Sequence, residues 1–205
     1  MFFIKKIGIY GGTFNPPHIG HLLLAENAAC DLGLDRIIFM TGGNPPHKEK
    51  NSVIDKYDRL KMTELLIKGN NKFSLSDFEV KKNSLSYTAE TLCELKKVYS
   101  GAELYFIIGL DSLYDIEGWY HPEIIFENAV IAVALREGYN LESVDAVIEK
   151  YKMKYNASIV KTNMPLIGIS SSDIRRRIKN GESIRYMTTD AVAEYIREKG
   201  LYESD

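Results

Sequence analysis

A cluster of glycine, proline and histidine residues near the start of the chain could bind an anion. From Gly11 to His21 the residues read GGTFNPPHIGH. A glycine pair after a strand lets the backbone turn tightly and approach an anion, and free N–H groups at the start of a following helix would add to that site. His18 and His21 are three residues apart, so on a helix they share one face and could address one phosphate. We expect Gly20 to leave room for a ligand.

Two common phosphate-binding motifs differ from this cluster. No Gly-Lys-Ser/Thr follows, as it would in a Walker A loop, and the glycine spacing is not that of the dinucleotide fingerprint. The alternative is a plain strand–turn–helix junction with two partly exposed histidines. Two histidines and three glycines in one short stretch favour the phosphate site.

A second cluster, ISSSDIRRR from Ile169 to Arg177, combines hydroxyl groups with a cation. Serines before a helical pattern predict an N-cap, and Arg175 follows one turn into that helix. Alone, the pattern also fits a capped surface helix with a basic face. Together with the first cluster it resembles the second half of a triphosphate clamp. We expect Arg176 and Arg177 to be solvated or paired.

Three further segments carry weaker signals. In the PPHK segment at 45–48, Lys48 offers a point charge to a phosphate or is simply solvated. Asp111, two residues after Gly109 and beyond a predicted strand, could accept hydrogen bonds from ribose hydroxyls. Trp119 could stack on an aromatic ring or fill a core.

The segment Ser86-Tyr87-Thr88 precedes a helical pattern and predicts an N-cap, or amides that hold a carboxylate. Zinc-type ligand spacing is absent from the sequence, and no serine stands beside a partnered histidine. This favours chemistry by positioning and charge, without a covalent intermediate.

The elements that must position these residues alternate between strand and helix. Strands are predicted at Lys6–Tyr10, Arg36–Met40, Phe73–Ser76, Leu104–Ile108, Val130–Leu135 and Ser158–Lys161. Helices are predicted at Gly20–Leu32, Lys56–Lys68, Ala89–Tyr99, Leu141–Tyr155, Ser172–Asn180 and Ala191–Lys199. This alternation predicts an α/β fold with a Rossmann-like, doubly wound, mainly parallel sheet and helices on both faces. Ligands bind such sheets beyond the carboxyl ends of the strands.

Composition narrows the protein class. The 205 residues are 45% hydrophobic, which excludes disorder, and 26 basic against 28 acidic side chains argue against a general nucleic-acid binder. The sequence has no apolar run of about 18 residues and no signal peptide at its start, so we expect a cytoplasmic protein without a membrane partner. Cys30 and Cys93 fall in helical patterns and are expected to be buried, reduced thiols.

Taken together, the motifs resemble those of the bacterial nicotinate-nucleotide adenylyltransferases, within the HxGH nucleotidyltransferase superfamily. The resemblance rests on the two clusters, the 45–48 segment, Ser86-Tyr87-Thr88, Gly109-x-Asp111 with Trp119, and the ending Val192…Tyr195-Ile196…Leu201-Tyr202. It covers essentially the whole chain. One departure is Glu137 in Arg-Glu-Gly-Tyr, where many relatives have proline.

The resemblance implies transfer of AMP from ATP to nicotinate mononucleotide, with Mg²⁺ carried by ATP and no metal ligands from the protein. It implies one nucleotidyltransferase domain over 1–205, in which the helical portion 170–205 completes the ATP site. The implied catalytic residues are His18, His21 and Arg175. The implied ATP-binding residues are Gly11, Gly12, Thr13, Phe14, His18, Gly20, His21, Lys48, Gly109, Asp111, Ile169, Ser170, Ser171 and Arg175. The implied mononucleotide-binding residues are Thr13, Asn15, Lys48, Ser86, Tyr87, Thr88 and Trp119.

Other functions stay open at this point. A related adenylyltransferase could act on nicotinamide mononucleotide or pantetheine phosphate. A non-catalytic nucleotide sensor could retain the same ATP pocket, and a nucleic-acid binder could use Arg175–Arg177. The sequence leaves the oligomeric state open, a homo-oligomer included.

Overall fold

The β-rich runs form one parallel sheet. The computed structural model describes residues 5–43, 53–82, 84–136, 141–164 and 167–203. Six parallel strands pair in the order β3-β2-β1-β4-β5-β6, which confirms the doubly wound α/β prediction. The strands are β1 (Lys6–Gly12), β2 (Arg36–Thr41), β3 (Phe73–Ser76), β4 (Glu103–Gly109), β5 (Val130–Arg136) and β6 (Ile159–Met164).

The predicted helices form, together with several short ones that the sequence did not indicate. The predicted helices correspond to α1 (Ile19–Leu32), α2 (Lys56–Ile67), α4 (Thr88–Val98), α7 (Leu141–Tyr155), α8 (Ser171–Lys179) and α9 (Asp190–Lys199). The additional ones are α3 (Phe78–Lys81), α5 (Leu110–Asp115), the 3₁₀ turn η2 (Ile116–Gly118) and α6 (Pro122–Asn128). One or two turns are too short to display a helical period.

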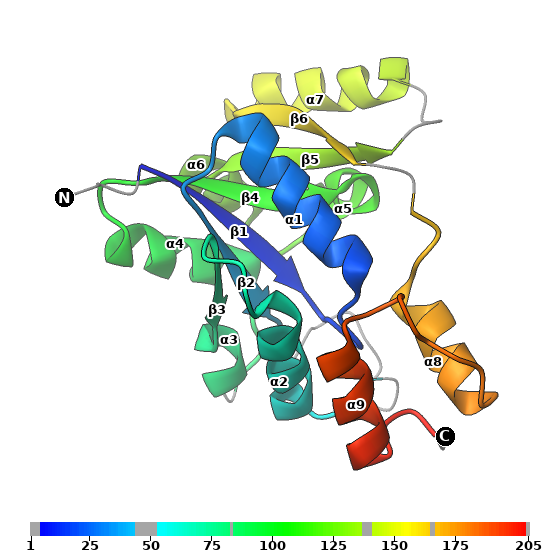
Figure 1. The fold of residues 1–205 in the computed structure, drawn as a ribbon. Coiled ribbons are helices and arrows are strands. Elements are labelled where there is room, and N and C mark those ends of the chain that lie inside the picture. The colour runs from blue at the N-terminus through cyan, green and yellow to red at the C-terminus, as the bar shows by residue number, and fades with distance from the viewer. Residues whose placement is uncertain (1–4, 44–52, 83, 137–140, 165–166, 204–205) are drawn as a thin grey trace.

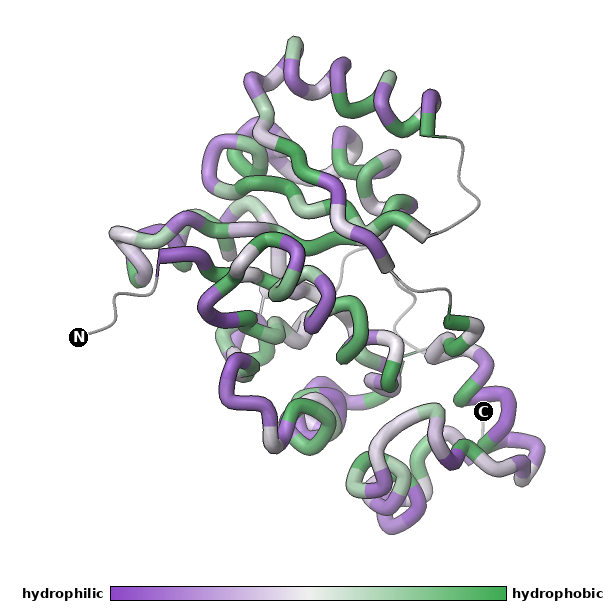
Figure 2. The backbone as a smooth tube through the Cα atoms, turned by 45° about the horizontal axis from the view of Figure 1, so that its top comes forward, coloured by the Kyte–Doolittle hydropathy of each residue, from purple (hydrophilic) through white to green (hydrophobic). Residues whose placement is uncertain are grey.

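Helices cover both faces of the sheet (Figure 1). One face packs on α1, α2 and α9 through residues such as Ala25, Met62 and Ile196. The other face packs on α4, α5, α6 and α7 through residues such as Leu92 and Ile148. Figure 2 shows hydrophobic residues gathered along the central strands and alternating with hydrophilic ones along the helices. Burial on both faces explains why the strands read as nearly continuous apolar runs.

The C-terminal helices lie beyond the carboxyl end of β1. Figure 1 shows α8 and α9 near the start of α1, and the N–H of Ile19 donates to the carbonyl of Met187 at 2.9 Å. The Tyr195 hydroxyl of α9 donates to Asp58 of α2 at 2.8 Å. The C-terminal portion is therefore attached to the edge of the sheet where a site was predicted.

The cysteine prediction was wrong about burial. Both cysteines are free, but Cys30 is exposed and Cys93 is half-buried. Cys30 stands in the last turn of α1. None of the helices in the described ranges is long and apolar enough to cross a membrane.

The packing of α7 gives a stability prediction. Ile148 is 4% exposed, whereas Met153 on the same helix is 82% exposed. We expect Ile148→Ala to lower the free energy of unfolding by about 2–5 kcal/mol, because it leaves a cavity in the core. The control Met153→Ala should change it by no more than about 0.5 kcal/mol. Denaturant unfolding measures both, and equal effects would contradict the observed packing.

Candidate active site

The first cluster lies at the carboxyl end of β1, where the strand order reverses between β1 and β4. β1 continues past its predicted end, so Gly11 and Gly12 are strand residues paired with Met40 and Thr41 of β2, not a turn after the strand. The loop after β1 then leads directly into α1. The carboxyl ends of β1 and β4 meet here, as expected for a ligand site in a doubly wound sheet.

Side chains from the C-terminal portion hold this loop by its carbonyl groups. Arg175 Nη1 donates to the carbonyl of Asn15 at 2.7 Å. Ser171 Oγ donates to Pro16 at 2.8 Å, and Thr188 Oγ1 donates to Pro17 at 3.0 Å. Three successive carbonyls are thus bound by residues more than 150 positions away.

The side chain of Asn15 is also bound by the C-terminal portion of the chain. Its side-chain Oδ1 accepts a hydrogen bond from the Tyr202 hydroxyl at 2.9 Å, and the residue is 4% exposed. Burial raises the pKa of Tyr202, against the opposing effect of Arg175 and Arg59. The hydroxyl therefore stays protonated and keeps donating to Asn15.

The two histidines stand together at the start of α1, as predicted. His18 is the N-cap residue, and its ring centroid lies 3.7 Å from that of His21. His21 Nδ1 accepts from the backbone N–H of His18 at 3.0 Å. Burial, and then the neighbouring His18, lower the pKa of His21 well below 6.5. A neutral ring whose Nδ1 accepts a hydrogen bond carries its proton on Nε2, so His21 can donate to an anion from that atom.

Two glycines of the first cluster make room for aromatic rings. A Cβ on Gly20 would lie 3.0 Å from His18 Cε1 and Nδ1. The space expected to admit a ligand is therefore occupied by the His18 ring. A Cβ on Gly12 would lie 2.8 Å from the Phe14 ring. Phe14 adopts a φ of 50°, and its ring packs edge-on against His21 with centroids 5.0 Å apart.

The second cluster forms the predicted capped helix. Ser170 is the N-cap of α8 and accepts from the N–H of Asp173 at 3.1 Å. Arg175, one turn in, lies against the loop after β1, and its Nη2 also donates to Ser172 Oγ at 3.3 Å. Ile169, just before the cap, is half-buried. The N-termini of α1 and α8 therefore approach the same loop from two sides.

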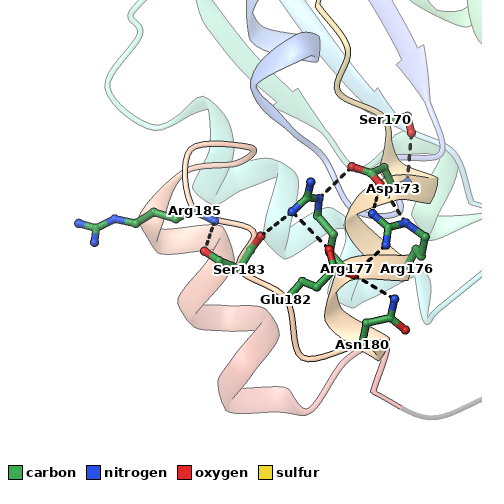
Figure 3. A network of polar contacts seen from close by, with 8 residues as sticks. All are labelled: Ser170, Asp173, Arg176, Arg177, Asn180, Glu182, Ser183 and Arg185. Atoms are coloured by element: carbon green, nitrogen blue, oxygen red, sulfur yellow. Dashed lines mark hydrogen bonds and ion pairs between the residues drawn. The ribbon is translucent and has the colours of Figure 1, made fainter.

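Arg176 and Arg177 are paired with carboxylates, as predicted (Figure 3). Both donate to Asp173, at 2.7 Å from Arg176 Nη2 and at 3.0 Å from Arg177 Nε. Arg176 Nη1 also contacts Glu182 at 2.8 Å. Hydrogen bonds from Arg176 and then Arg177 lower the pKa of Asp173. Their charges are largely balanced within this network, unlike that of Arg175.

A cavity of about 340 Å³ opens beside the first cluster. It brings together predicted residues of three segments with others that were not predicted. Its lining includes Gly11, Gly12, Thr13, Gly42, Glu79, Ser86, Tyr87, Thr88, Thr91, Phe106, Ser112, Trp119 and Tyr120. Trp119 packs edge-on against Phe106 with centroids 6.3 Å apart. It therefore both lines the cavity and contacts the core.

The start of α4 forms one wall of this cavity. Tyr87 is the N-cap residue, without a side-chain cap, so the predicted serine or threonine cap is not made. Ser86 Oγ is buried with no hydrogen-bond partner among the described residues. The Tyr87 ring packs on Tyr120 with centroids 4.4 Å apart. The wall thus combines the N-terminus of a helix with a buried hydroxyl that has no partner in the part of the chain that the structure describes.

Some predicted site residues lie apart from this cavity or outside the described part of the chain. Gly109 is the last residue of β4, and Asp111 is exposed in the first turn of α5. Both stand at the carboxyl edge of the sheet next to β1, but they do not belong to the cavity lining. Lys48 and Glu137 lie outside the described residues.

Arg59 is a site residue that the sequence analysis missed. It is 1% exposed, and its guanidinium donates to the carbonyls of Thr13 at 2.7 Å, Gly43 at 2.9 Å and Ile54 at 3.2 Å. It thereby links the ends of β1 and β2. Burial lowers its pKa, although an arginine stays charged. Its position within the predicted helix at 56–68 gave no sign of this role.

The described residues contain no group of three or more His, Cys, Asp or Glu side chains that could hold a metal ion. The site instead presents hydrogen-bond donors: imidazole, guanidinium, hydroxyl and backbone N–H groups. Such a set suits an anion.

The neutral state of His21 predicts a pH dependence of stability. As pH falls below 6.5, the unfolded chain protonates this imidazole and the folded protein does not, so the free energy of unfolding falls. His21→Gln removes this component. We expect the wild type to lose stability relative to the variant by about 1.4 kcal/mol per pH unit below 6.5, down to the folded-state pKa. Denaturant unfolding between pH 7 and 5 measures this, and a difference independent of pH would contradict it.

Comparisons with known proteins identify the family. Residues 9–177 match the cytidylyltransferase-like family. A probable nicotinate-nucleotide adenylyltransferase from Lachnoclostridium phytofermentans is 42% identical, and the match covers 97% of this chain and all of the relative. One from Caldicellulosiruptor bescii is also 42% identical, over 97% of this chain and 99% of the relative.

The fold also matches solved structures. A Plasmodium falciparum nicotinic acid mononucleotide adenylyltransferase complexed with APC superposes with a TM-score of 0.79, over 98% of each chain at 20% identity. At that identity the likeness concerns the fold. The full-length relatives carry the closer assignment: this chain belongs to the cytidylyltransferase-like family and, within it, to the nicotinate-nucleotide adenylyltransferases.

Proposed function

We propose that the protein transfers the adenylyl group of ATP to nicotinate mononucleotide, giving deamido-NAD and pyrophosphate. One observation carries the proposal: the loop after β1 stands between a set of anion donors and an aromatic-walled cavity of about 340 Å³. A dinucleotide is made where two nucleotides meet, and this edge offers a place for each. Relatives of that name, about 42% identical over their full length, support the assignment.

The donor set is assigned to ATP. In this proposal His18, His21 and Arg175 contact the phosphates, with Ser171 and the start of α8 on the terminal ones. Lys48 adds charge to the same group. Helix N-termini favour such an anion because their N–H groups are unpaired. Arg175 and Ser171 already donate to the loop carbonyls, so their side chains are oriented before ATP arrives.

The other residues assigned to ATP binding lie along the carboxyl edge of the sheet. Gly109 and Asp111 would lie along the adenosine, with the Asp111 carboxylate accepting from ribose hydroxyls. Gly11, Gly12 and Phe14 shape the backbone beneath the nucleotide. Their role is packing, since Gly12 admits the Phe14 ring.

The cavity is assigned to the mononucleotide. The pyridine ring would stack on Trp119, and its carboxylate would accept from the amides of Tyr87 and Thr88 at the start of α4. The Ser86 hydroxyl, buried and without a partner among the described residues, is a further donor at this wall. Thr13 and Asn15, between the two groups, would face the mononucleotide phosphate.

The reaction depends on positioned hydrogen-bond donors and positive charge, and it needs no strong general base. The 5′-phosphate is ionised near pH 7, so one of its oxygens attacks the α-phosphorus of ATP in line. That P–O bond forms while the bond to the β-phosphate oxygen breaks, and pyrophosphate leaves. Donors from His21, His18 and Arg175 stabilise the charge that develops on the phosphate oxygens. Mg²⁺ would enter on the ATP phosphates and add Lewis-acid stabilisation there.

Pyrophosphate release tests the function. ATP and Mg²⁺ are supplied with nicotinate mononucleotide, nicotinamide mononucleotide or pantetheine phosphate in parallel. We expect strong preference for nicotinate mononucleotide, because the start of α4 favours a carboxylate. Equal use of the two mononucleotides would overturn the assignment of the pyridine site. Release with pantetheine phosphate alone would identify a related transferase, and release with none would favour a nucleotide sensor.

Single substitutions test the donor set. We expect His21→Ala and Arg175→Ala each to lower kcat by at least about a hundredfold, the loss typical of one preorganised donor. Arg176→Ala is the matched control and should stay within about threefold, because Arg176 is paired with Asp173. Steady-state kinetics and circular dichroism are measured together. A folded His21→Ala with nearly unchanged kcat would contradict the assigned role.

A cytoplasmic location remains a prediction of this proposal.

A further inference from the structure

The cavity has two walls that belong to different parts of the chain. One is the end of β2 with Gly42, and the other is α4 with Thr88 and Thr91. Between them stands Glu79, on the short helix α3. Its carboxylate lines the cavity and is not among the proposed ligand contacts.

Glu79 joins the two walls by hydrogen bonds. Thr91 Oγ1 on α4 donates to Glu79 Oε1 at 2.8 Å. The N–H of Gly43, just after β2, donates to the same carboxylate. Thr91 is 3% exposed, so its contact is shielded from water. Burial raises the pKa of Glu79, against the opposing effects of Thr91, Lys82 and Gly43.

The carbonyl group of Gly43 is hydrogen-bonded as well as its N–H group. Its carbonyl accepts from Arg59 Nη2 at 2.9 Å, and Arg59 Nη1 continues to Thr13. A Cβ on Gly43 would lie 2.2 Å from the backbone carbonyl oxygen of Glu79. Backbone therefore lies against backbone here, and only glycine allows that approach. The two charged groups, Arg59 and Glu79, hold Gly43 between them.

We propose that Glu79 is a positioning residue that sets the separation of Gly43 from Thr91, and thereby the affinity of the cavity for the mononucleotide. This rests on the proposed function of the cavity. Of the donors assigned to ATP, His18 and His21 come from the start of α1 and Arg175 comes from α8, elements apart from the Glu79 bridge. Loss of the Glu79 bridge should therefore affect mononucleotide binding far more than ATP binding.

Substitution of Glu79 by glutamine distinguishes the effect of the hydrogen-bonded bridge from the effect of the negative charge. Its carbonyl oxygen can accept from Gly43 while its NH₂ group donates to Thr91 Oγ1, because a hydroxyl can serve as donor or acceptor. Glu79→Gln therefore keeps the bridge without the negative charge. Glu79→Ala removes both, and Thr91→Val removes one end of the bridge.

The only tryptophan of the chain provides a binding signal that does not depend on turnover. Trp119 lines the cavity, so titration of its fluorescence with nicotinate mononucleotide gives a Kd for each variant. Steady-state pyrophosphate release gives the KM for ATP. Thermal unfolding shows whether each variant is folded.

We expect Glu79→Ala to weaken mononucleotide binding by about tenfold or more, the scale of one lost hydrogen bond to a charged group. The KM for ATP should stay within about threefold. Glu79→Gln should bind within about threefold of wild type. Thr91→Val should weaken binding in the same direction, and the double variant should be less than additive because the two residues share one contact. The matched control is Glu94→Ala on α4, whose glutamate pairs with Lys97, and it should bind like the wild type.

Three results would overturn the positioning role. They are unchanged binding by Glu79→Ala, equal changes in mononucleotide Kd and ATP KM, and a Glu79→Gln variant as weak as Glu79→Ala. The last would mean that the charge acts on the ligand directly. If Glu79→Ala does not fold, Thr91→Val decides by the same criteria. A wild-type protein that neither binds the mononucleotide nor releases pyrophosphate would instead overturn the proposed function.

Discussion

Hydrogen bonds from distant side chains to the carbonyls after β1 shape the whole site. Pro16 and Pro17 have no backbone N–H, so the loop after β1 has fewer donors for its own carbonyl groups. Those carbonyls therefore need hydrogen-bond donors from other parts of the chain. Arg59 supplies the partner for Thr13, and three residues of the C-terminal portion supply those for the carbonyls at 15–17. Because the donors come from separate elements, they together hold Phe14 in a left-handed conformation beside the histidines. Strain of this kind persists only where the surroundings fix it.

The electrostatics of the site depend on which of its arginines are already paired with carboxylates. On α8 the second and third arginines are balanced by Asp173 and Glu182, which leaves Arg175 as the guanidinium directed at the loop. His21 contributes a neutral donor, because its burial disfavours the imidazolium. The arrangement thus favours an anion through oriented dipoles and the guanidinium of Arg175. Such donors need little reorganisation when charge develops on a phosphate.

Sequence patterns predict the sheet and the long helices well, because buried parallel strands are apolar runs and long helices show their period. The resemblance of the two clusters to the halves of a triphosphate clamp also predicts that they meet. The sequence patterns miss α3, which is a single turn, and with it Glu79. They miss Arg59 because a buried arginine and an exposed one look alike within a helical pattern, and its partners are backbone carbonyls far along the chain. The expectation of ligand space at Gly20 was wrong, because the ring of His18, the N-cap residue of the same helix, fills that space.

The contacts that fix the loop after β1 also set an order of events during synthesis. The residues that carry the carbonyls at 15–17 and the Asn15 side chain leave the ribosome early. Their donors at 171, 175, 188 and 202 follow 155 to 187 residues later. All six strands have by then left the ribosome, so the sheet can assemble before its ligand edge is complete. Such long-range closures form late in folding. A nascent chain would therefore complete the contacts that fix this loop only after residues 171–202 have emerged.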